Sequence, residues 1–235
     1  MQRSRASTAA AVAALALLCG TQSIQAQETA RKVSNGGIMV PGWMGTLDPN
    51  DQAGGEMLEH SRLEKQGEAL HVTTGPAVTY WNPMNTASGQ YTVSATFNEP
   101  QYMNLNDHPH PYGIVIGGND MGTAQQSYLY CAAYGTGAFI VRGFGPEPFQ
   151  MNGRRAEMND AVHKAAGKGE PVTQEIAVTV TSDAVKCSIN GTEVASYPKS
   201  EVVGEGKLKS TDGVFGIRFA HNTEGTVSGL KVTSN

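Results

Sequence analysis

Apolar and polar residues alternate one for one in several segments of this chain, and no other feature constrains its fold as strongly. In residues 91–97, Tyr, Val, Ala and Phe are separated by Thr, Ser and Thr. The alternation recurs in residues 176–181, 185–189 and 215–220. A period of two places every apolar side chain of a strand on one face. Each of these segments is therefore expected to be a half-buried β-strand.

Shorter segments with the same pattern complete the expected strands. They are residues 70–73, 77–81, 112–116, 127–133, 138–144, 193–197 and 227–232. Asn190-Gly191 predicts a hairpin between two of the strands, and Ser228-Gly229 a bulge within the last one. Only residues 154–166 resemble a helix. Many short alternating strands favour an all-β fold, a two-sheet antiparallel sandwich of the jelly-roll kind with at most one short helix.

The first 26 residues have the three-part pattern of a secretory signal peptide. Arg3 and Arg5 precede an unbroken apolar run at residues 9–18, and small and polar residues follow up to Ala26. The apolar run is about half the roughly 20 residues that a membrane-spanning helix needs. We therefore expect cleavage after Ala26, a periplasmic or secreted protein, and no membrane span in the mature chain.

The predicted mature chain is acidic and of single-domain size. Removing 26 of the 235 residues leaves 209, with 15 Lys and Arg against 21 Asp and Glu. An acidic chain without clustered Lys and Arg lacks the surface that nucleic-acid binding requires. We expect residues 27–41 to be an N-terminal extension and residues 42–235 to form one domain.

Two cysteines remain after the predicted cleavage, Cys131 and Cys187. Each lies on the apolar side of an alternating segment, so both side chains are expected to point into the core. An oxidising compartment would allow a disulfide between them. The alternative is two buried free thiols, because the sequence does not show whether their strands are neighbours.

Several segments resemble bacterial exported proteins with a concanavalin A-like (laminin G-like) jelly roll, near the 3-keto-disaccharide hydrolase-like domains. The resemblance rests on the segments 111–118, 139–143, 189–194 and 212–232, which carry glycine at turns and apolar residues on core faces. It implies the same jelly-roll fold over residues 42–233. Lectins, glycan-binding modules and glucanases share this fold, so the resemblance leaves the activity open.

The carboxylate pattern of a laminarinase-type glucanase is absent from the sequence. These enzymes carry Glu-x-Asp-x-x-Glu on one strand, which directs a nucleophile and an acid into the cleft. The nearest matches here are Glu56-Met-Leu-Glu59 and Glu157-Met-Asn-Asp160. Neither places three carboxylates on an expected strand, so no catalytic residue is assigned.

The segment 104–110 is the most polar cluster and contains His108 and His110 on either side of a proline. Three interpretations remain open for it: a solvent-facing turn, a loop that contacts a ligand, and a metal site. Imidazoles would suit a transition metal, whereas the nearby oxygen-bearing side chains would suit calcium. We predict no resident metal or cofactor, and keep calcium as the alternative.

A second group of side chains is expected on the face opposite the core. Period two assigns Tyr128, Tyr130, Arg142 and Arg218 to that face. Tyrosine rings can stack on sugars, and arginines can donate hydrogen bonds to sugar hydroxyls. The predicted ligand site consists of these four residues together with His108, His110 and Tyr112 beside them.

These features favour an exported carbohydrate-binding or polysaccharide-associated module with a glycan partner. One alternative is a periplasmic glycoside hydrolase-like enzyme related to the 3-keto-disaccharide hydrolases. A third is a structural or adhesive envelope protein. Turnover of a sugar would distinguish the second hypothesis, and protein partners without any sugar response would distinguish the third.

Overall fold

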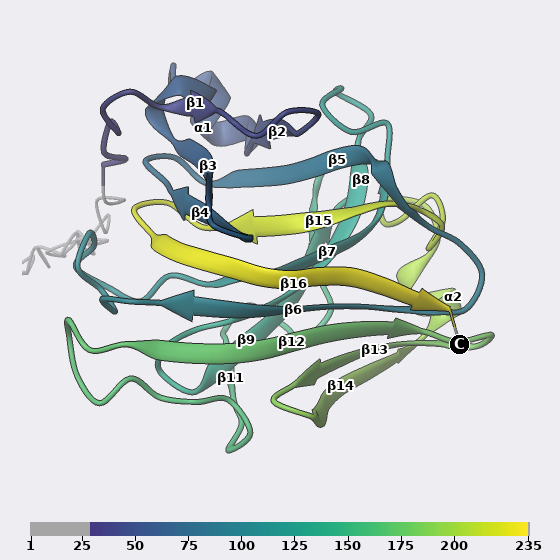
Figure 1. Cartoon of the computed structure of the whole chain (residues 1–235). Coiled ribbons are helices and arrows are strands. Elements are labelled where there is room, and N and C mark those ends of the chain that lie inside the picture. The colour runs from purple at the N-terminus through teal and green to yellow at the C-terminus, as the bar shows by residue number, and fades with distance from the viewer. Residues whose placement is uncertain (1–28, 235) are drawn as a thin grey trace, which may run out of the picture.

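The computed structural model of this protein describes residues 29–234, so the predicted signal peptide lies outside the described residues. Two β-sheets pack face to face (Figure 1). The first sheet has the order β1-β3-β4-β16-β6-β12-β13-β14. Its strands are β1 (Gly37–Ile38), β3 (Arg62–Gln66), β4 (Ala69–Thr73), β16 (Glu224–Ser234), β6 (Tyr91–Glu99), β12 (Val172–Val180), β13 (Ala184–Ile189) and β14 (Thr192–Pro198).

The second sheet has the order β10-β9-β8-β7-β15-β5-β2, and β11 pairs with β9 beside this path. Its strands are β10 (Pro148–Gln150), β9 (Ala138–Phe144), β8 (Ser127–Ala133), β7 (Tyr112–Asn119), β15 (Gly213–Phe219), β5 (Val78–Ala87), β2 (Met44–Leu47) and β11 (Glu157–Met158). Neighbouring strands run antiparallel, as Figure 1 shows for β16, β6 and β12, except that β1 and β3 are parallel.

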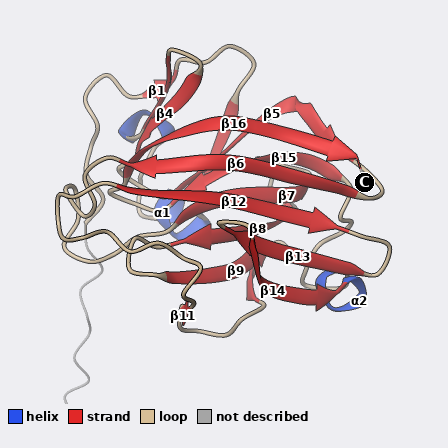
Figure 2. Ribbon diagram, turned by 60° about the horizontal axis from the view of Figure 1, so that its bottom comes forward, coloured by secondary structure: helices blue, strands red, loops and turns tan. Residues whose placement is uncertain are grey.

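The predicted antiparallel sandwich is therefore confirmed, and each strand expected from the alternation is present. The prediction of a helix at residues 154–166 is wrong, because this segment consists of turns, bends and the two-residue strand β11. Elsewhere in residues 29–234 there are three short helices: α1 (Pro49–Ala53), α2 (Lys199–Val202) and the 3₁₀ helix at Leu58–His60. Figure 2 shows how small α1 and α2 are beside the strands. Among residues 29–234 no helix is long and apolar enough to cross a bilayer.

The core fills the space between the inner faces of the two sheets. An aromatic cluster within it joins Phe97 of β6 to Tyr112 of β7 and Phe219 of β15, with ring centres 5.7–6.0 Å apart. Part of the predicted N-terminal extension also belongs to the sandwich. β1 pairs with β3, and Val40 is buried in the core.

A disulfide between Cys131 and Cys187 crosses the core. Cys131 lies on β8 of the second sheet and Cys187 on β13 of the first, with Cα atoms 6.0 Å apart. The bond therefore ties the two sheets together. Cys131 and Cys187 therefore lie on facing strands of the two sheets and not on neighbouring strands of one sheet.

Candidate functional site

The outer face of the second sheet carries the four side chains that period two assigned to it. Tyr128 and Tyr130 alternate with the buried Leu129 and Cys131, and Tyr130 lies opposite Arg142 in the β8–β9 register. This face is apolar beneath its polar tips, because a second cluster of buried side chains lies on it. The cluster includes two of the four residues and consists of Val115, Tyr128, Tyr130, Ala132, Ile140 and Phe144.

Arg218 forms a buried ion pair on this outer face. Its guanidinium donates two parallel hydrogen bonds to Asp48, at 2.7 Å to Oδ1 and 2.6 Å to Oδ2. It also donates to Thr79 Oγ1 and lies within 3.4 Å of the Tyr128 hydroxyl. Arg218 was predicted to bind ligand, but its hydrogen-bond donors are engaged by protein groups. It instead holds the segment formed by Asp48 and α1, the Asp48 segment, on the sheet.

The Asp48 segment is a helix start that covers part of the sheet. Asp48 stands at the N-cap of α1, followed by Pro49 at the first helical position, where proline is favoured. Its carboxylate makes no cap hydrogen bond to α1, because both oxygens accept from Arg218. Arg218 therefore fixes where α1 lies relative to the strands.

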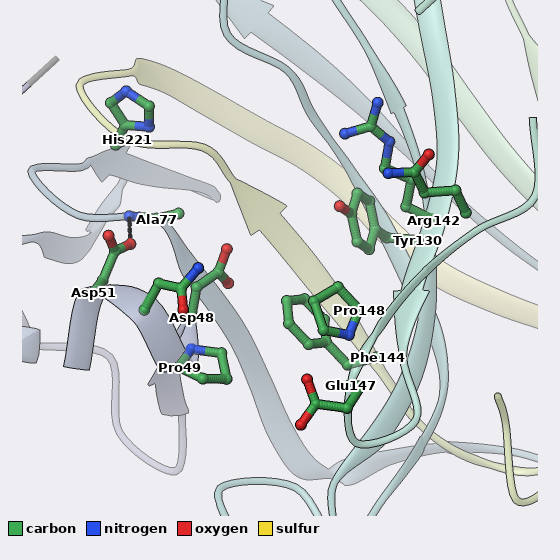
Figure 3. A pocket seen from close by; sticks show the side chains of 12 residues that line it. Asp48, Pro49, Asp51, Ala77, Tyr130, Arg142, Phe144, Glu147, Pro148 and His221 are labelled. Atoms are coloured by element: carbon green, nitrogen blue, oxygen red, sulfur yellow. Dashed lines mark hydrogen bonds between the residues drawn. The ribbon is translucent and has the colours of Figure 1, made fainter. Parts of the chain in front are cut away.

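A pocket of about 350 Å³ lies between this segment, the loop after β9 and the exposed ends of the outer-face side chains. Figure 3 shows it from close by. Its lining residues are Asp48, Pro49, Asn50, Asp51, Ala77, Tyr130, Arg142, Phe144, Glu147, Pro148, Gln150 and His221. The lining thus combines the rings of Tyr130 and Phe144 and two prolines with carboxylates, amides, one guanidinium and the imidazole of His221.

Asp51 is a half-buried carboxylate in the pocket wall. Its Oδ2 accepts a hydrogen bond from the Ala77 amide at 3.1 Å, drawn as a dashed line in Figure 3. Burial raises the pKa of Asp51, and the nearby charges of Asp48 and Glu56 raise it further, against the lowering effect of the amide and of Arg218. The pocket therefore contains one carboxyl that is easier to protonate than an exposed aspartate.

Arg142 and Glu147 bring opposite charges to the other side of the pocket. Arg142 comes from β9, and its guanidinium donates one hydrogen bond to the Arg154 carbonyl at 2.9 Å. Glu147 comes from the loop between β9 and β10 and is exposed. Figure 3 shows both side chains on the wall that faces α1.

Two predicted ligand residues are inaccessible. Tyr112 is 1% exposed and stacks with Phe97 and Phe219 between the sheets, so its assignment to the ligand surface is wrong. Its position in β7 has the same parity as Ile114 and Ile116, which also face the core. Tyr128 does lie on the outer face, but it is 1% exposed and its ring is covered.

The predicted site thus divides into separate parts. Tyr130 and Arg142 line the pocket, while Arg218 and Tyr128 support it from beneath. His108 and His110 lie beside His221, which lines the pocket as well. The structure brings these three histidines together from two loops.

Sequence reasoning predicted Tyr130 and Arg142 and missed the other lining residues, including the titratable side chains of Asp48, Asp51, Glu147 and His221. The dipeptide Asp48-Pro49 is a recognisable helix start, yet nothing in the sequence shows that this helix lies on the outer face. Glu147 and His221 lie in loops whose position depends on strand pairing far along the chain. Alternation within strands carries no information about such loops.

Comparison of the sequence with known protein families and with curated proteins finds no match. Solved structures do share the fold. The carbohydrate-binding module CBM66 from Bacillus subtilis superposes with a TM-score of 0.54 at 7% identity, covering 85% of this chain and 99% of that one. An endo-β-1,3-glucanase from Pyrococcus furiosus gives 0.54 at 11% identity, covering 82% and 88%. A Bacillus subtilis protein of unknown function with a galectin-like fold gives 0.54 at 12%, covering 82% and 89%.

The molecule is accordingly a two-sheet antiparallel jelly-roll sandwich, and its fold is similar to those of these solved structures, in agreement with the fold that the sequence resemblance implied. At these identities the similarity concerns the fold alone. A binding module and a hydrolase both occur among these similar structures, so the fold by itself assigns no activity to this chain.

Proposed function

We propose that this protein is an exported carbohydrate-binding module, and that a saccharide binds in the pocket between α1 and the loop after β9. The pocket carries the proposal, because apolar rings and hydrogen-bonding groups converge in it. Its volume of about 350 Å³ lies at the small end of the range of ligand sites, roughly 300–1,000 Å³. Such a volume suits a short saccharide or the end of a glycan chain.

The chemistry of the lining favours a neutral sugar. Tyr130 and Phe144, which are 7% and 5% exposed, offer a small apolar contact to the C–H groups of a sugar where they reach the pocket. Asp51 and Glu147 accept hydrogen bonds from hydroxyl groups, and Arg142 donates them. Two carboxylates against one guanidinium disfavour an anionic sugar, since the charge of Asp48 is already paired with Arg218.

Export is part of the proposal and is supported by two features. The basic, apolar and small-residue regions of residues 1–26 follow the order of a signal peptide. The Cys131–Cys187 disulfide suits an oxidising compartment outside the cytoplasm. Mass spectrometry of the exported protein is expected to find a mature chain that starts at Gln27.

The binding hypothesis is tested with a glycan array, followed by calorimetric titration of the sugars that bind. Arg142→Met and Glu147→Gln should each weaken binding about tenfold, which corresponds to about 1.4 kcal/mol. The matched control is Lys186→Met, because Lys186 is an exposed cation on β13 of the other sheet. The proposal fails if no glycan binds, or if the pocket variants bind as tightly as Lys186→Met.

One observation favours a second candidate, a glycoside hydrolase. Such enzymes need two carboxyl groups, one of them an acid whose pKa is raised. The pocket contains Asp51, whose pKa is raised by burial, and the exposed Glu147 on another element. An enzyme predicts that reducing sugar is released, that Asp51→Asn and Glu147→Gln each abolish the release, and that Asp183→Asn keeps it. Asp183 is an exposed acid on the turn between β12 and β13 of the other sheet.

A further inference from the structure

Three imidazole rings meet beside the saccharide pocket. The ring centres of His110 and His221 are 3.9 Å apart, those of His108 and His110 are 4.3 Å apart, and those of His108 and His221 are 6.0 Å apart. One ring nitrogen from each residue lies within 4.8 Å of the other two. We refer to His108, His110 and His221 as the histidine cluster.

Strand pairing brings the cluster together. His110 precedes β7 and His221 follows β15, and these two strands are antiparallel with Tyr112 opposite Phe219. The ladder continues one step beyond the strands, because the Ala220 amide donates to the Pro111 carbonyl at 3.0 Å. The two histidines are therefore neighbours as a result of the sheet register.

The loops that carry the cluster are fixed by Asn222. This residue is fully buried in the left-handed region, at φ 51°, which asparagine tolerates better than most residues. Its backbone N–H donates to the Gly75 carbonyl, and its backbone carbonyl accepts a hydrogen bond from the side-chain amide of Asn106 at 2.9 Å. Asn106 lies in the segment that leads to His108, so one residue anchors both loops.

Two of the three rings are shielded from solvent by the protein. His110 is 5% exposed and His221 is half-buried, whereas His108 is exposed. The histidine cluster therefore lies at the protein surface with its inner side covered.

Two further features of the histidine cluster are typical of metal-binding histidines. The Nε2 atom of His221 is buried and has no hydrogen-bond partner among the described residues, although a buried polar atom normally has one. The Nδ1 atom of His108 lies at hydrogen-bond distance from Asp107 Oδ1. A carboxylate that binds the second nitrogen of a histidine orients the ring and increases its basicity in metal sites.

We propose that the histidine cluster is a binding site for a divalent transition metal of the zinc class. Four-coordinate zinc holds imidazole nitrogens at about 2.0–2.1 Å, which places ligand atoms about 3.3 Å from one another. Small side-chain rotations close the cluster from its present spacing to that geometry. Calcium, the ion kept open on sequence grounds, does not suit the cluster, because it binds oxygen ligands.

Three protein ligands leave a coordination position for water or for an exogenous ligand. His221 also lines the saccharide pocket, so the proposed metal site lies beside that pocket. The metal site extends beyond the proposed carbohydrate binding and does not depend on it. Metal binding is measured without any sugar, so either proposal can fail alone.

The test uses untagged mature protein that has been stripped of metal with a chelator and is then titrated with Zn²⁺ by calorimetry. We expect one equivalent to bind, and Co²⁺ to give the visible absorption of a low-coordinate site. His221→Gln and His108→Ala should each lower Zn²⁺ affinity at least tenfold. His108 is exposed, so its variant folds even if a buried substitution does not. The matched control is His163→Ala, at an exposed histidine outside the cluster.

A second measurement uses stability. Zn²⁺ should raise the Tm of the wild-type protein and of His163→Ala, because a ligand that binds only the folded state stabilises it. It should leave the Tm of His108→Ala unchanged. The proposal is overturned if Zn²⁺ does not bind, or if it binds with the same affinity to wild type, His221→Gln and His108→Ala.

Discussion

The guanidinium carbon of Arg218 lies 4.8 Å from the centre of the Tyr130 ring, on the outer face of the second sheet. The contact is a cation–π interaction in which the arginine is buried and the tyrosine borders the pocket. Two residues that the alternation placed on one face therefore have different roles. Arg218 supports the pocket from beneath, and Tyr130 forms part of its wall.

Arg218→Met should destabilise the fold by about 3 kcal/mol, because it leaves the carboxylate of Asp48 without its partner. Arg218→Lys should cost part of this, since lysine cannot make the two parallel hydrogen bonds. The measurement is urea unfolding of the variants. Arg142→Met serves as the comparison and should cost less than about 1 kcal/mol, because its bond to Arg154 is at the surface. Equal losses for Met at 142 and 218 would contradict the anchoring role.

The sequence predicted the sheets well because alternation is a local property. The inward positions of Phe215, Ile217 and Phe219 and the outward position of Arg218 follow from period two alone. The wrong predictions concern which side chains are accessible on each face of a sheet. Tyr112 was assigned to the ligand surface although its own parity with Ile114 and Ile116 points to the core.

The pocket and the histidine cluster could not be predicted in the same way. His221 reaches His110 only because β15 pairs with β7, and Asp48 reaches Arg218 across 170 residues of sequence. Both contacts depend on register and on loop paths, which are set by pairings between distant segments. No pattern within a single strand encodes them.

Tyr130→Phe tests whether the hydroxyl of Tyr130 contacts the saccharide. The variant keeps the ring, and with it the packing against Tyr128 and Arg218, so the free energy of unfolding should change by less than about 1 kcal/mol. Glycan affinity should fall about threefold or more, which is the size of one hydrogen bond. Tyr197→Phe on β14 of the other sheet is the control. Equal affinity in both variants would exclude the hydroxyl from the site.

The Cys131–Cys187 disulfide should stabilise the fold substantially. It closes a loop with a sequence separation of 56 residues, for which the chain-entropy estimate is about 4 kcal/mol. Urea unfolding with and without a reductant measures this contribution. The double variant Cys131→Ala/Cys187→Ala should be less stable than the wild type and insensitive to the reductant. A wild-type protein with the same unfolding curve in both conditions would contradict the prediction.

The buried carboxyl of Glu99 should make the protein less stable as the pH rises. Glu99 is 3% exposed, its Oε1 accepts a hydrogen bond from the Met103 amide at 3.2 Å, and its Oε2 has no hydrogen-bond partner among residues 29–234. Burial raises the pKa of Glu99 from 4.5 to about 7, against the lowering effect of the amide. Below pH 4.5 the group is protonated in both the folded and the unfolded chain, so it costs nothing. Between pH 4.5 and 7 the unfolded chain loses the proton first, and stability falls until the folded group ionises as well.

Glu99→Gln removes this ionisation while keeping the shape of the side chain. A shift of one pKa unit corresponds to about 1.4 kcal/mol. The free energy of unfolding of the variant should therefore exceed that of the wild type by up to about 3 kcal/mol at pH 8, and by close to nothing at pH 4. Urea unfolding at the two pH values gives the difference directly, and the contributions of all other titrating groups cancel between variant and wild type. Glu175→Gln, at an exposed position on β12, is the control and should show no such gain. If Glu99→Gln shifts stability equally at pH 4 and pH 8, the carboxyl has the same pKa in the folded and the unfolded chain, and burial has not raised it.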